Sequence, residues 1–237
     1  IRNTFRYLLG NLNDNFGEKI HIEGNFSGPF GYNYSKKMWR GSLKENPTGG
    51  MAAMGIHVID QMITANGNIS SAYAQTAKVI KMGELDEITS VLFKFSNGST
   101  GYLGTSIASS VFYNFRIIAE NGVIEISEKD LSVLKYTPRE GDVEITNIKD
   151  ADMCKNELEA FADAISGLSS YPVTSEEGIH GAAVFEAVIT SSPFFRFSDK
   201  REIKIASVPL PTATAYLHLY FFRKFFSNVE RFSPKNI

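Results

Sequence analysis

The chain has 237 residues, of which 43% are hydrophobic and 21% are charged, and its net charge at pH 7 is −2. This composition is typical of a globular protein with a real core, and the absence of a basic stripe argues against a nucleic-acid partner. The single cysteine, Cys154, excludes an internal disulfide framework, and no apolar run is long enough to span a membrane, so we expect a cytoplasmic protein.

In chain order, residues 5–11 should end a helix, and residues 19–26 alternate in polarity as a strand does. Residues 28–37 form a loop rich in Gly, Tyr and Asn. Apolar side chains then recur at helical spacing over residues 51–65, and the helix stops at Asn66-Gly67. The remaining elements are expected to be strands at 72–79, 88–95, 100–108, 112–119, 123–127, 131–136 and 143–148, and helices at 156–168 and 175–191.

Local signals support two of these assignments. Asn97-Gly98 lies between two strand patterns and favours a tight hairpin turn. Ser175, followed by Glu176 and Glu177, gives the last helix a cap and an acidic first turn. Helices near both ends with strands between them predict an α+β fold, in which one open, mostly antiparallel sheet carries helices on one face.

The second face of such a sheet is either solvated or buried against another copy of the chain. Five apolar strand residues could supply the area for that contact: Tyr102, Leu103, Phe112, Tyr113 and Phe115. The same residues could instead line the internal core, and alternation alone does not separate the two readings.

The segment from Trp39 to Asp60 carries most of the chemical information. It joins a Trp39-Arg40 pair, the glycines Gly49 and Gly50, and a helix that contains His57 and Asp60. A glycine-rich turn that runs into a helix leaves backbone N–H groups free to hold an anion or a polarised oxygen. His57 and Asp60 are three residues apart, so the carboxylate could meet the imidazole and fix its tautomer.

Each residue also has a purely structural interpretation. A lone histidine on a mostly apolar helix is more often a hydrogen-bonded core residue than a catalyst. Trp39 could be a core anchor, and Arg40 could be a salt-bridge partner. Cys154 has no histidine or second cysteine at ligand spacing, so we expect no metal site.

Taken together, these residues resemble the glucose–fructose oxidoreductase / inositol dehydrogenase / MocA (Gfo/Idh/MocA) family of nicotinamide-dependent oxidoreductases. Trp39-Arg40, Gly49-Gly50 and residues 55–60 are similar to its W-R … G-G … G-x-H-x-x-D segment. Residues 116–126 resemble its G-t-x-G-x-i-x-i hairpin. Residues 157–165 and 171–178 resemble its late helix and the p-v-t-x-e-e-g start of the next one. The resemblance extends over roughly residues 1–205.

The resemblance implies an enzyme that exchanges a hydride between NAD or NADP and a sugar, polyol or related hydroxyl or keto compound. It makes His57 the catalytic residue, and it makes Trp39, Arg40, Gly49, Gly50 and Asp60 the substrate-binding residues. Relatives bind the dinucleotide with an N-terminal Rossmann domain and a catalytic lysine in a Glu-Lys-Pro motif, and this sequence contains neither G-x-G-x-x-G nor Glu-Lys-Pro. We therefore expect a C-terminal substrate and dimerisation domain, inactive alone, that forms a homo-oligomer through its open sheet face.

One departure keeps alternatives open. Many relatives carry an aspartate four residues before the histidine, where this chain has Ala53. A non-catalytic ligand-binding or dimerisation module is therefore the alternative function, and hydrolysis or lyase chemistry with retained NAD is a further enzymatic one.

Residues 206–237 form a tail that does not resemble the family. It is rich in Tyr and Phe and has four basic side chains against one acidic one. A foreign or frame-shifted end is our preferred account of this tail, ahead of a docking helix and of a membrane-surface segment.

Overall fold

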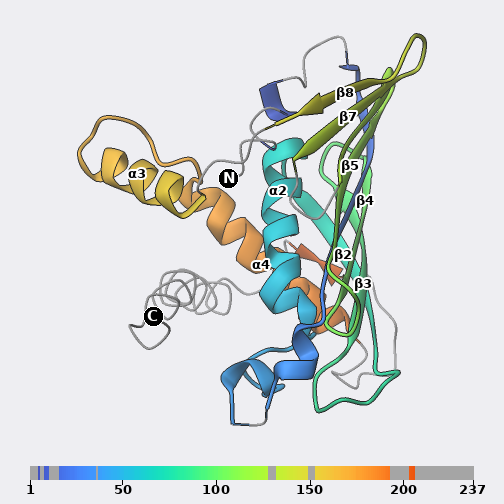
Figure 1. Ribbon diagram of the computed structural model, residues 1–237, viewed down its shortest axis with the longest axis vertical. Coiled ribbons are helices and arrows are strands. Elements are labelled where there is room, and N and C mark those ends of the chain that lie inside the picture. Colours follow the sequence, from blue (N-terminus) through green and yellow to red (C-terminus); the bar gives the residue numbers. More distant parts are fainter. Residues whose placement is uncertain are drawn as a thin grey trace.

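The computed structural model describes residues 5, 8–10, 16–35, 37–127, 132–148, 153–192 and 203–205. Its centre is one open sheet of nine strands in the order β8-β7-β6-β5-β1-β4-β3-β2-β9 (Figure 1). The strands are β1 (Lys19–Ser27), β2 (Ile69–Ala77), β3 (Ile88–Phe95), β4 (Thr100–Ser106), β5 (Phe112–Ala119), β6 (Gly122–Ser127), β7 (Val133–Pro138), β8 (Glu144–Asn147) and β9 (Ile203–Lys204). The predicted tail 206–237 lies outside the described residues.

The sheet is antiparallel except at its centre. There β1 lies parallel to β4 and antiparallel to β5, so it separates two strands that follow each other in sequence. The helices are α2 (Ile56–Asn66), α3 (Met153–Ile165) and α4 (Ser175–Ser191). Helices α2 and α4 pack on one face of the sheet, and α3 stands further out on the same side (Figure 1). The predicted fold class is therefore confirmed.

Sequence-local signals account for several boundaries. The β3–β4 hairpin turns at Gly98, which has a φ of 91°. Helix α2 ends at Gly67, whose N–H donates to the carbonyl of Ile63. Helix α4 begins with a capping box, in which Thr174 and Glu177 satisfy each other's backbone N–H groups. The cap is Thr174, one residue before the serine that the sequence suggested.

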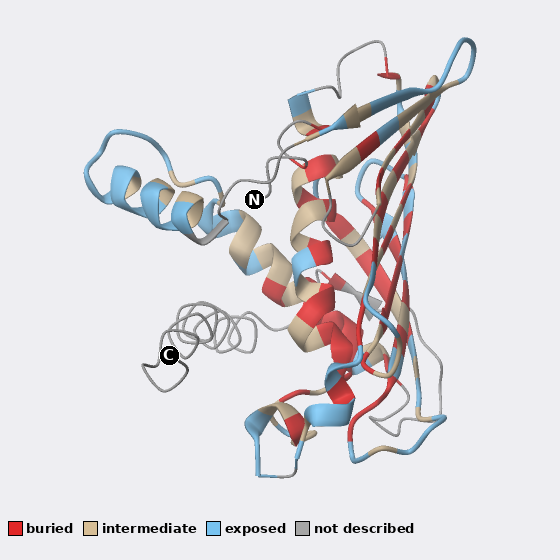
Figure 2. Ribbon diagram, viewed as in Figure 1, coloured by how far each residue is buried: buried red, intermediate tan, exposed pale blue. Residues whose placement is uncertain are grey.

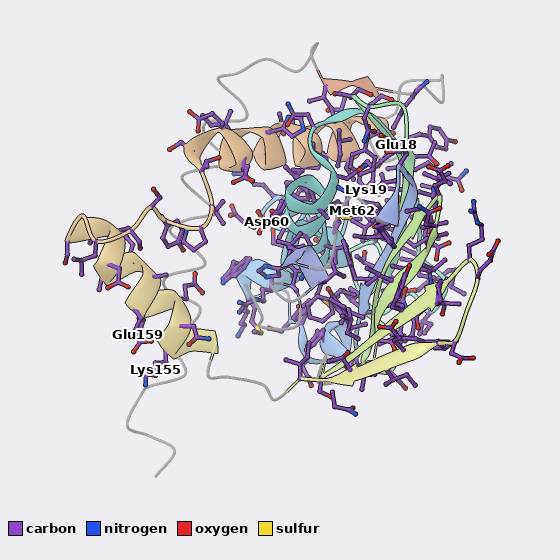
Figure 3. All side chains as sticks on the ribbon, turned by 90° about the horizontal axis from the view of Figure 1, so that it is seen from above. Glu18, Lys19, Asp60, Met62, Lys155 and Glu159 are labelled. Atoms are coloured by element: carbon purple, nitrogen blue, oxygen red, sulfur yellow. The ribbon has the colours of Figure 1, made fainter. Side chains whose placement is uncertain are left out.

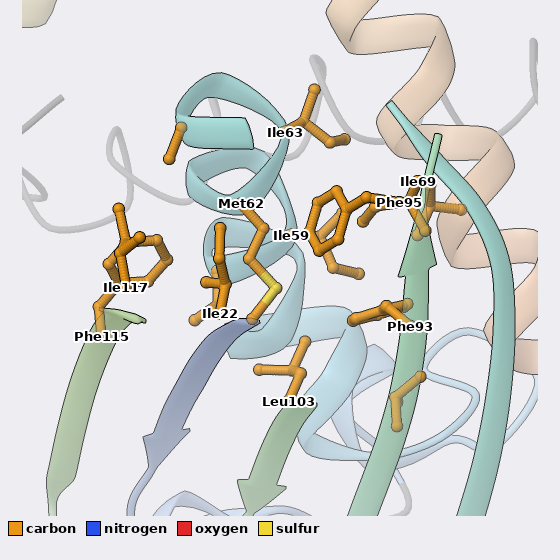
Figure 4. Packing of buried hydrophobic residues seen from close by; sticks show 14 of the residues in the cluster. Ile22, Ile59, Met62, Ile63, Ile69, Phe93, Phe95, Leu103, Phe115 and Ile117 are labelled. Atoms are coloured by element: carbon orange, nitrogen blue, oxygen red, sulfur yellow. The ribbon is translucent and has the colours of Figure 1, made fainter. Parts of the chain in front are cut away.

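The core fills the space between the sheet and helices α2 and α4 (Figures 2 and 4). Ile59 and Met62 of α2 are fully buried against the sheet, where Ile22 and Leu103 are buried beneath them. Gly24 of β1 allows this close approach, because a Cβ there would lie 2.3 Å from Cγ1 of Val58. Each buried aliphatic side chain stabilises the fold by roughly 1.5–3 kcal/mol.

Helix α4 also accepts hydrogen bonds from β2, which the described part of β9 pairs at Ser71 and Ala72. The N–H of Ile69 donates to Nε2 of His180 at 2.9 Å, and the N–H of Ala74 donates to Oγ of Ser191 at 2.6 Å. The acceptors His180 and Ser191 are about three helical turns apart, and the donors Ile69 and Ala74 are five strand residues apart. Both separations are roughly 16 Å, so the helix and the strand match in length. Two side chains of one helix thus cover the edge of a strand.

This arrangement predicts a pH-dependent stability. Burial lowers the pKa of His180 below its ordinary value, so the imidazole is neutral and Nε2 can accept the Ile69 N–H. In the unfolded chain His180 has its ordinary pKa, so it binds a proton at a higher pH than in the folded chain. The free energy of unfolding should therefore be highest above pH 6.5 and should fall as the pH drops below it. Urea unfolding at pH 5.0 and pH 7.5 measures the difference.

The control for this experiment is His180→Gln, whose side-chain oxygen can accept the same N–H but does not titrate in this range. The difference in stability between wild type and His180→Gln should change between the two pH values. A difference that stays constant would show that His180 does not carry the effect.

The open face of the sheet carries a polar centre beside apolar residues. Arg116 of β5 donates from Nη1 to Oε2 of Glu23 on β1 at 2.7 Å, and from Nε to Oε2 of Glu125 on β6 at 2.7 Å. Burial would raise the pKa of Glu125, but its hydrogen bond and ion pair with Arg116 outweigh this and lower it. On the neighbouring strands, Tyr102 of β4 is the register partner of Glu23, and Leu92 of β3 is the register partner of Tyr102.

The five apolar residues that could form a contact between copies lie on both faces of the sheet. Tyr102 and Phe112 are 36% and 53% exposed, whereas Leu103, Tyr113 and Phe115 are buried in the core on the helix side.

Candidate active site on helix α2

Helix α2 is preceded by one π-helical turn, η4 (Met51–Gly55), where the sequence predicted a regular α-helix. The N–H of Ile56 reaches back to the carbonyl of Met51, five residues earlier. The wide turn brings Gly55 against the sulfur of Met51, where a Cβ would lie only 2.2 Å away. Single π-turns inside helices are frequent at functional sites.

The turn that leads into this helix is strained and buried. Thr48 and Gly49 both have positive φ, at 59° and 55°. A Cβ on Gly49 would lie 2.0 Å from the carbonyl oxygen of Asp86, and Gly50 lies against Thr105 and Ile107. The hydroxyl of Thr89 donates to the carbonyl of Thr48 at 2.8 Å and ties the turn to the sheet. Close packing of Gly49 on the loop before β3, and of Gly50 on the end of β4, therefore accounts for both glycines, and a role for them in substrate binding stays a prediction.

Trp39 and Arg40 lie on a short 3₁₀ turn, η3 (Trp39–Gly41), in the loop before the helix. The guanidinium carbon of Arg40 is 4.4 Å from the centroid of the Trp39 ring, so the cation covers one face of the indole. The side-chain amide of Asn46 donates to the carbonyl of Arg40 at 2.9 Å and fixes the turn. Trp39 is 39% exposed, so it is not a core anchor.

His57 is exposed and Asp60 is partly exposed, although α2 buries Val58, Ile59 and Met62. The core-histidine reading of His57 therefore does not apply. Asp60 lies on the side of α2 that faces α3, away from the sheet (Figure 3). Ala53, in contrast, packs against the small cluster of Met54, Leu85 and Ile107.

Lys19 follows Glu18, and this Glu-Lys pair lacks the proline of the Glu-Lys-Pro motif. Lys19 donates from Nζ to the carbonyl of Ala65 at 2.7 Å, and thus caps the C-terminus of α2 about two turns beyond His57 (Figure 3). In this fold the Lys19 ammonium is thus engaged at the end of the helix.

Two polar groups near the loop have no sequence signal of their own. Burial would raise the pKa of Glu87, but hydrogen bonds from backbone N–H groups lower it, among them those of Met82, Ile80 and Val79 at 2.8, 2.6 and 2.7 Å. Burial raises the pKa of Tyr34, and the nearby Arg40 offsets part of that rise. Glu87 and Tyr34 line a shallow pocket between the 31–41 loop and the 82–87 loop. Because these partners are distant in sequence, no local pattern identifies them.

Among the described residues, no three His, Cys, Asp or Glu side chains gather as a metal site would require. None of the helices in the same part of the chain has both the length and the apolar character needed to cross a bilayer.

Comparison with known proteins decides the family. Residues 13–125 match the model of the GFO/IDH/MocA C-terminal domain, and this range includes the Trp39–Asp60 segment. The chain contains a GFO/IDH/MocA C-terminal domain. No curated protein matches the chain in sequence.

Solved structures share the fold of this GFO/IDH/MocA domain. A protein of Desulfitobacterium hafniense, described as an NADPH-dependent oxidoreductase, has a TM-score of 0.77 at 21% identity, over 87% of this chain and 63% of its own. Levoglucosan dehydrogenase, solved with NADH and levoglucosan, has a TM-score of 0.70 at 15% identity, over 85% and 62%. A UDP-N-acetylglucosamine 3-dehydrogenase of Acidithiobacillus ferrooxidans has a TM-score of 0.66 at 17% identity, over 81% and 58%.

The chain thus spans less than two thirds of the length of each of these proteins. At these identities the likeness establishes the fold of the GFO/IDH/MocA domain.

Proposed function

We propose that the chain is the substrate-side domain of an NAD- or NADP-dependent oxidoreductase that acts on a sugar, a polyol or a related hydroxyl or keto compound. The observation that carries the proposal is the exposure of His57 on α2, where Val58 and Ile59 are buried, in the same segment of the chain as Trp39 and Arg40. An exposed imidazole in a segment of this family is accessible to a substrate hydroxyl.

Each residue has a role in this proposal. His57 hydrogen-bonds the reacting hydroxyl and takes its proton as the alcohol becomes a ketone. Asp60 orients His57 or binds a second hydroxyl. Arg40 binds a hydroxyl, carboxylate or phosphate, and the exposed part of Trp39 accepts an apolar sugar surface. The backbone of Gly49 and Gly50 shapes the floor of the site.

A bound nicotinamide supplies the chemistry of taking or giving the hydride. The exposed His57 on α2 is compatible with such a partner, because solvent reaches its side chain. The sequence offers no glycine-rich dinucleotide turn, so the residues of this chain act on the substrate, and a domain like that of the longer relatives would hold the cofactor phosphates.

The second candidate is a ligand-binding module without catalysis. Ala53 favours it, since this position lacks the carboxylate of many relatives and packs against apolar neighbours.

The test uses the natural protein with any domain that precedes this chain. Oxidation or reduction of the nicotinamide, followed by its absorbance, should depend on added levoglucosan or L-sorbose. Affinity for the sugar should also rise when the cofactor is present, because linked sites affect each other reciprocally. Sugar binding that is indifferent to cofactor, without turnover, would favour the binding module.

We also propose that the open sheet face forms a homodimer. Leu92 is 57% exposed, and together with Tyr102 and Phe112 it offers apolar area beside the Glu23–Arg116–Glu125 centre. Leu92→Lys should shift the protein from dimer to monomer in sedimentation velocity, because it places a charge within the contact. Leu158→Lys on α3, which is also exposed, is the control and should leave the dimer intact.

A further inference from the structure

Helix α3 packs little against the rest of the described structure. No other described helix or strand forms an extensive contact with it, and it lies apart from the sheet on the side of α2 and α4 (Figure 1). Most of its surface is exposed (Figure 2). A helix of 13 residues is only marginally stable when it is isolated in water, so α3 needs a partner surface to remain folded.

The exposed side of α3 carries an apolar stripe. Its four large side chains recur at intervals of three, four and three residues, which places them on one face of a helix. They are Leu158, Phe161, Ile165 and Leu168, and they are 62%, 50%, 70% and 76% exposed. Single exposed apolar residues are common on protein surfaces, whereas a contiguous stripe of them marks a contact site.

The C-terminus of α3 holds the last member of this stripe in place. The N–H of Leu168 donates to the carbonyl of Asp163 at 2.9 Å, and the N–H of Gly167 donates to that of Ala164 at 3.2 Å. Together with a φ of 71° at Gly167, these two bonds form a Schellman motif. The backbone of Leu168 is therefore fixed just beyond the last turn, and the stripe continues past the end of the helix.

The chain enters the described structure on the same side of the sheet. Phe5 packs edge-on against Phe115, with ring centroids 5.5 Å apart, and Phe115 is buried on the helix side. The solved relatives are longer than this chain, which matches 63% of the D. hafniense protein and 62% of levoglucosan dehydrogenase. A domain that precedes the chain would therefore be connected on the side where the apolar stripe is exposed.

Charge and position agree with such a partner. Helix α3 carries three acidic side chains against one basic one, so the partner should present an apolar patch with basic residues at its rim. Asp60, on the same helix as His57, lies on the side of α2 that faces α3 (Figure 3). A domain that covers the apolar stripe would therefore lie beside the candidate site, where the proposed reaction requires a nicotinamide.

We propose that the apolar stripe of α3 is the docking surface for the cofactor-binding domain of the whole protein. This inference rests on the proposed function and deepens it, because it assigns the surface through which the two domains meet. The stripe lies on the helix side of the sheet, so it is separate from the open face proposed for the homodimer. Docking also gives α3 the partner that its short length requires.

The test measures amide hydrogen exchange by mass spectrometry in the natural protein and in two variants of it. Ile165→Lys places a charge in the apolar stripe. Ile145→Lys is the matched control, because Ile145 is 63% exposed on β8, outside α3. Ile165→Lys should speed the exchange of α3 roughly tenfold, since a helix that loses its partner opens locally. A segment of the cofactor domain should lose protection in the same variant, while β3 keeps its protection and Ile145→Lys changes none of them.

Other occupants of the stripe would give different results. Faster exchange that is confined to α3 and residues 206–237 would make the tail the occupant. A dimer that dissociates in Ile165→Lys, measured by sedimentation velocity, would make the occupant a second copy of the chain. Either result would overturn the proposal, and so would equal exchange in the two variants.

Nicotinamide-linked turnover, measured on the same samples, reports on the proposed function separately. An active protein with equal exchange in Ile165→Lys and Ile145→Lys would overturn the docking surface alone. A protein without turnover and without nicotinamide binding would overturn the proposed function, and with it the assignment of the docked domain as the cofactor domain.

Discussion

Gly49→Ala should destabilise the fold by roughly 2–4 kcal/mol. Two physical effects add. The residue has a φ of 55°, which an L-side chain adopts only with strain. The new Cβ would also lie 2.0 Å from the carbonyl oxygen of Asp86, and this contact is with backbone that cannot rotate away. Urea unfolding of the two proteins under the same conditions gives the difference.

Gly167→Ala is the matched control for this experiment. Gly167 also has a positive φ, 71°, but no atom lies within 4 Å of its Cβ position. It should therefore show only the backbone strain, which is roughly 1 kcal/mol. Equal losses in the two variants would show that the contact with Asp86 relaxes easily. Our interpretation that the turn at Gly49 is tightly packed would then be wrong.

His57→Ala should lower kcat of the natural protein by about 10² to 10⁴-fold, because a positioned proton acceptor contributes this much to alcohol oxidation. The free energy of unfolding should change little, because the side chain is exposed. The measurement is the initial rate of nicotinamide reduction at saturating substrate, together with the melting temperature.

His21→Ala is the control for the histidine change itself. His21 lies on β1 and shares a hydrogen bond with Thr100, away from α2. Its loss should leave kcat unchanged. A His57→Ala variant with wild-type turnover would contradict the catalytic assignment of His57.

Much of the fold could be predicted from sequence, because its signals are local. The bounds of β3, β5 and α4 agree with the predicted ones, since alternation and a helix cap define them. Strand β2 begins at Ile69, three residues before the prediction. Its register shifts between Ile69 and Ser71, so a bulge interrupts the alternation there.

The candidate site could be predicted from sequence only within one continuous segment. Spacing and family resemblance make His57 and Asp60 candidates, but helical periodicity does not distinguish a π-turn at 51–55 from an α-turn. Glu87 and Tyr34 line one pocket although they are far apart in sequence. Only the folded topology brings such residues together, so local sequence patterns do not identify them.

The insertion of β1 between β4 and β5 has a consequence for the order of folding. Strands β2 to β4 and strands β5 to β8 are each connected by near neighbours in sequence, so either group can form from local contacts. Strand β1 must then join the two groups through pairings that span about 80 residues or more. The loop that carries Trp39 follows β1 in the chain, so the candidate site should be the last region to become protected in hydrogen exchange during refolding.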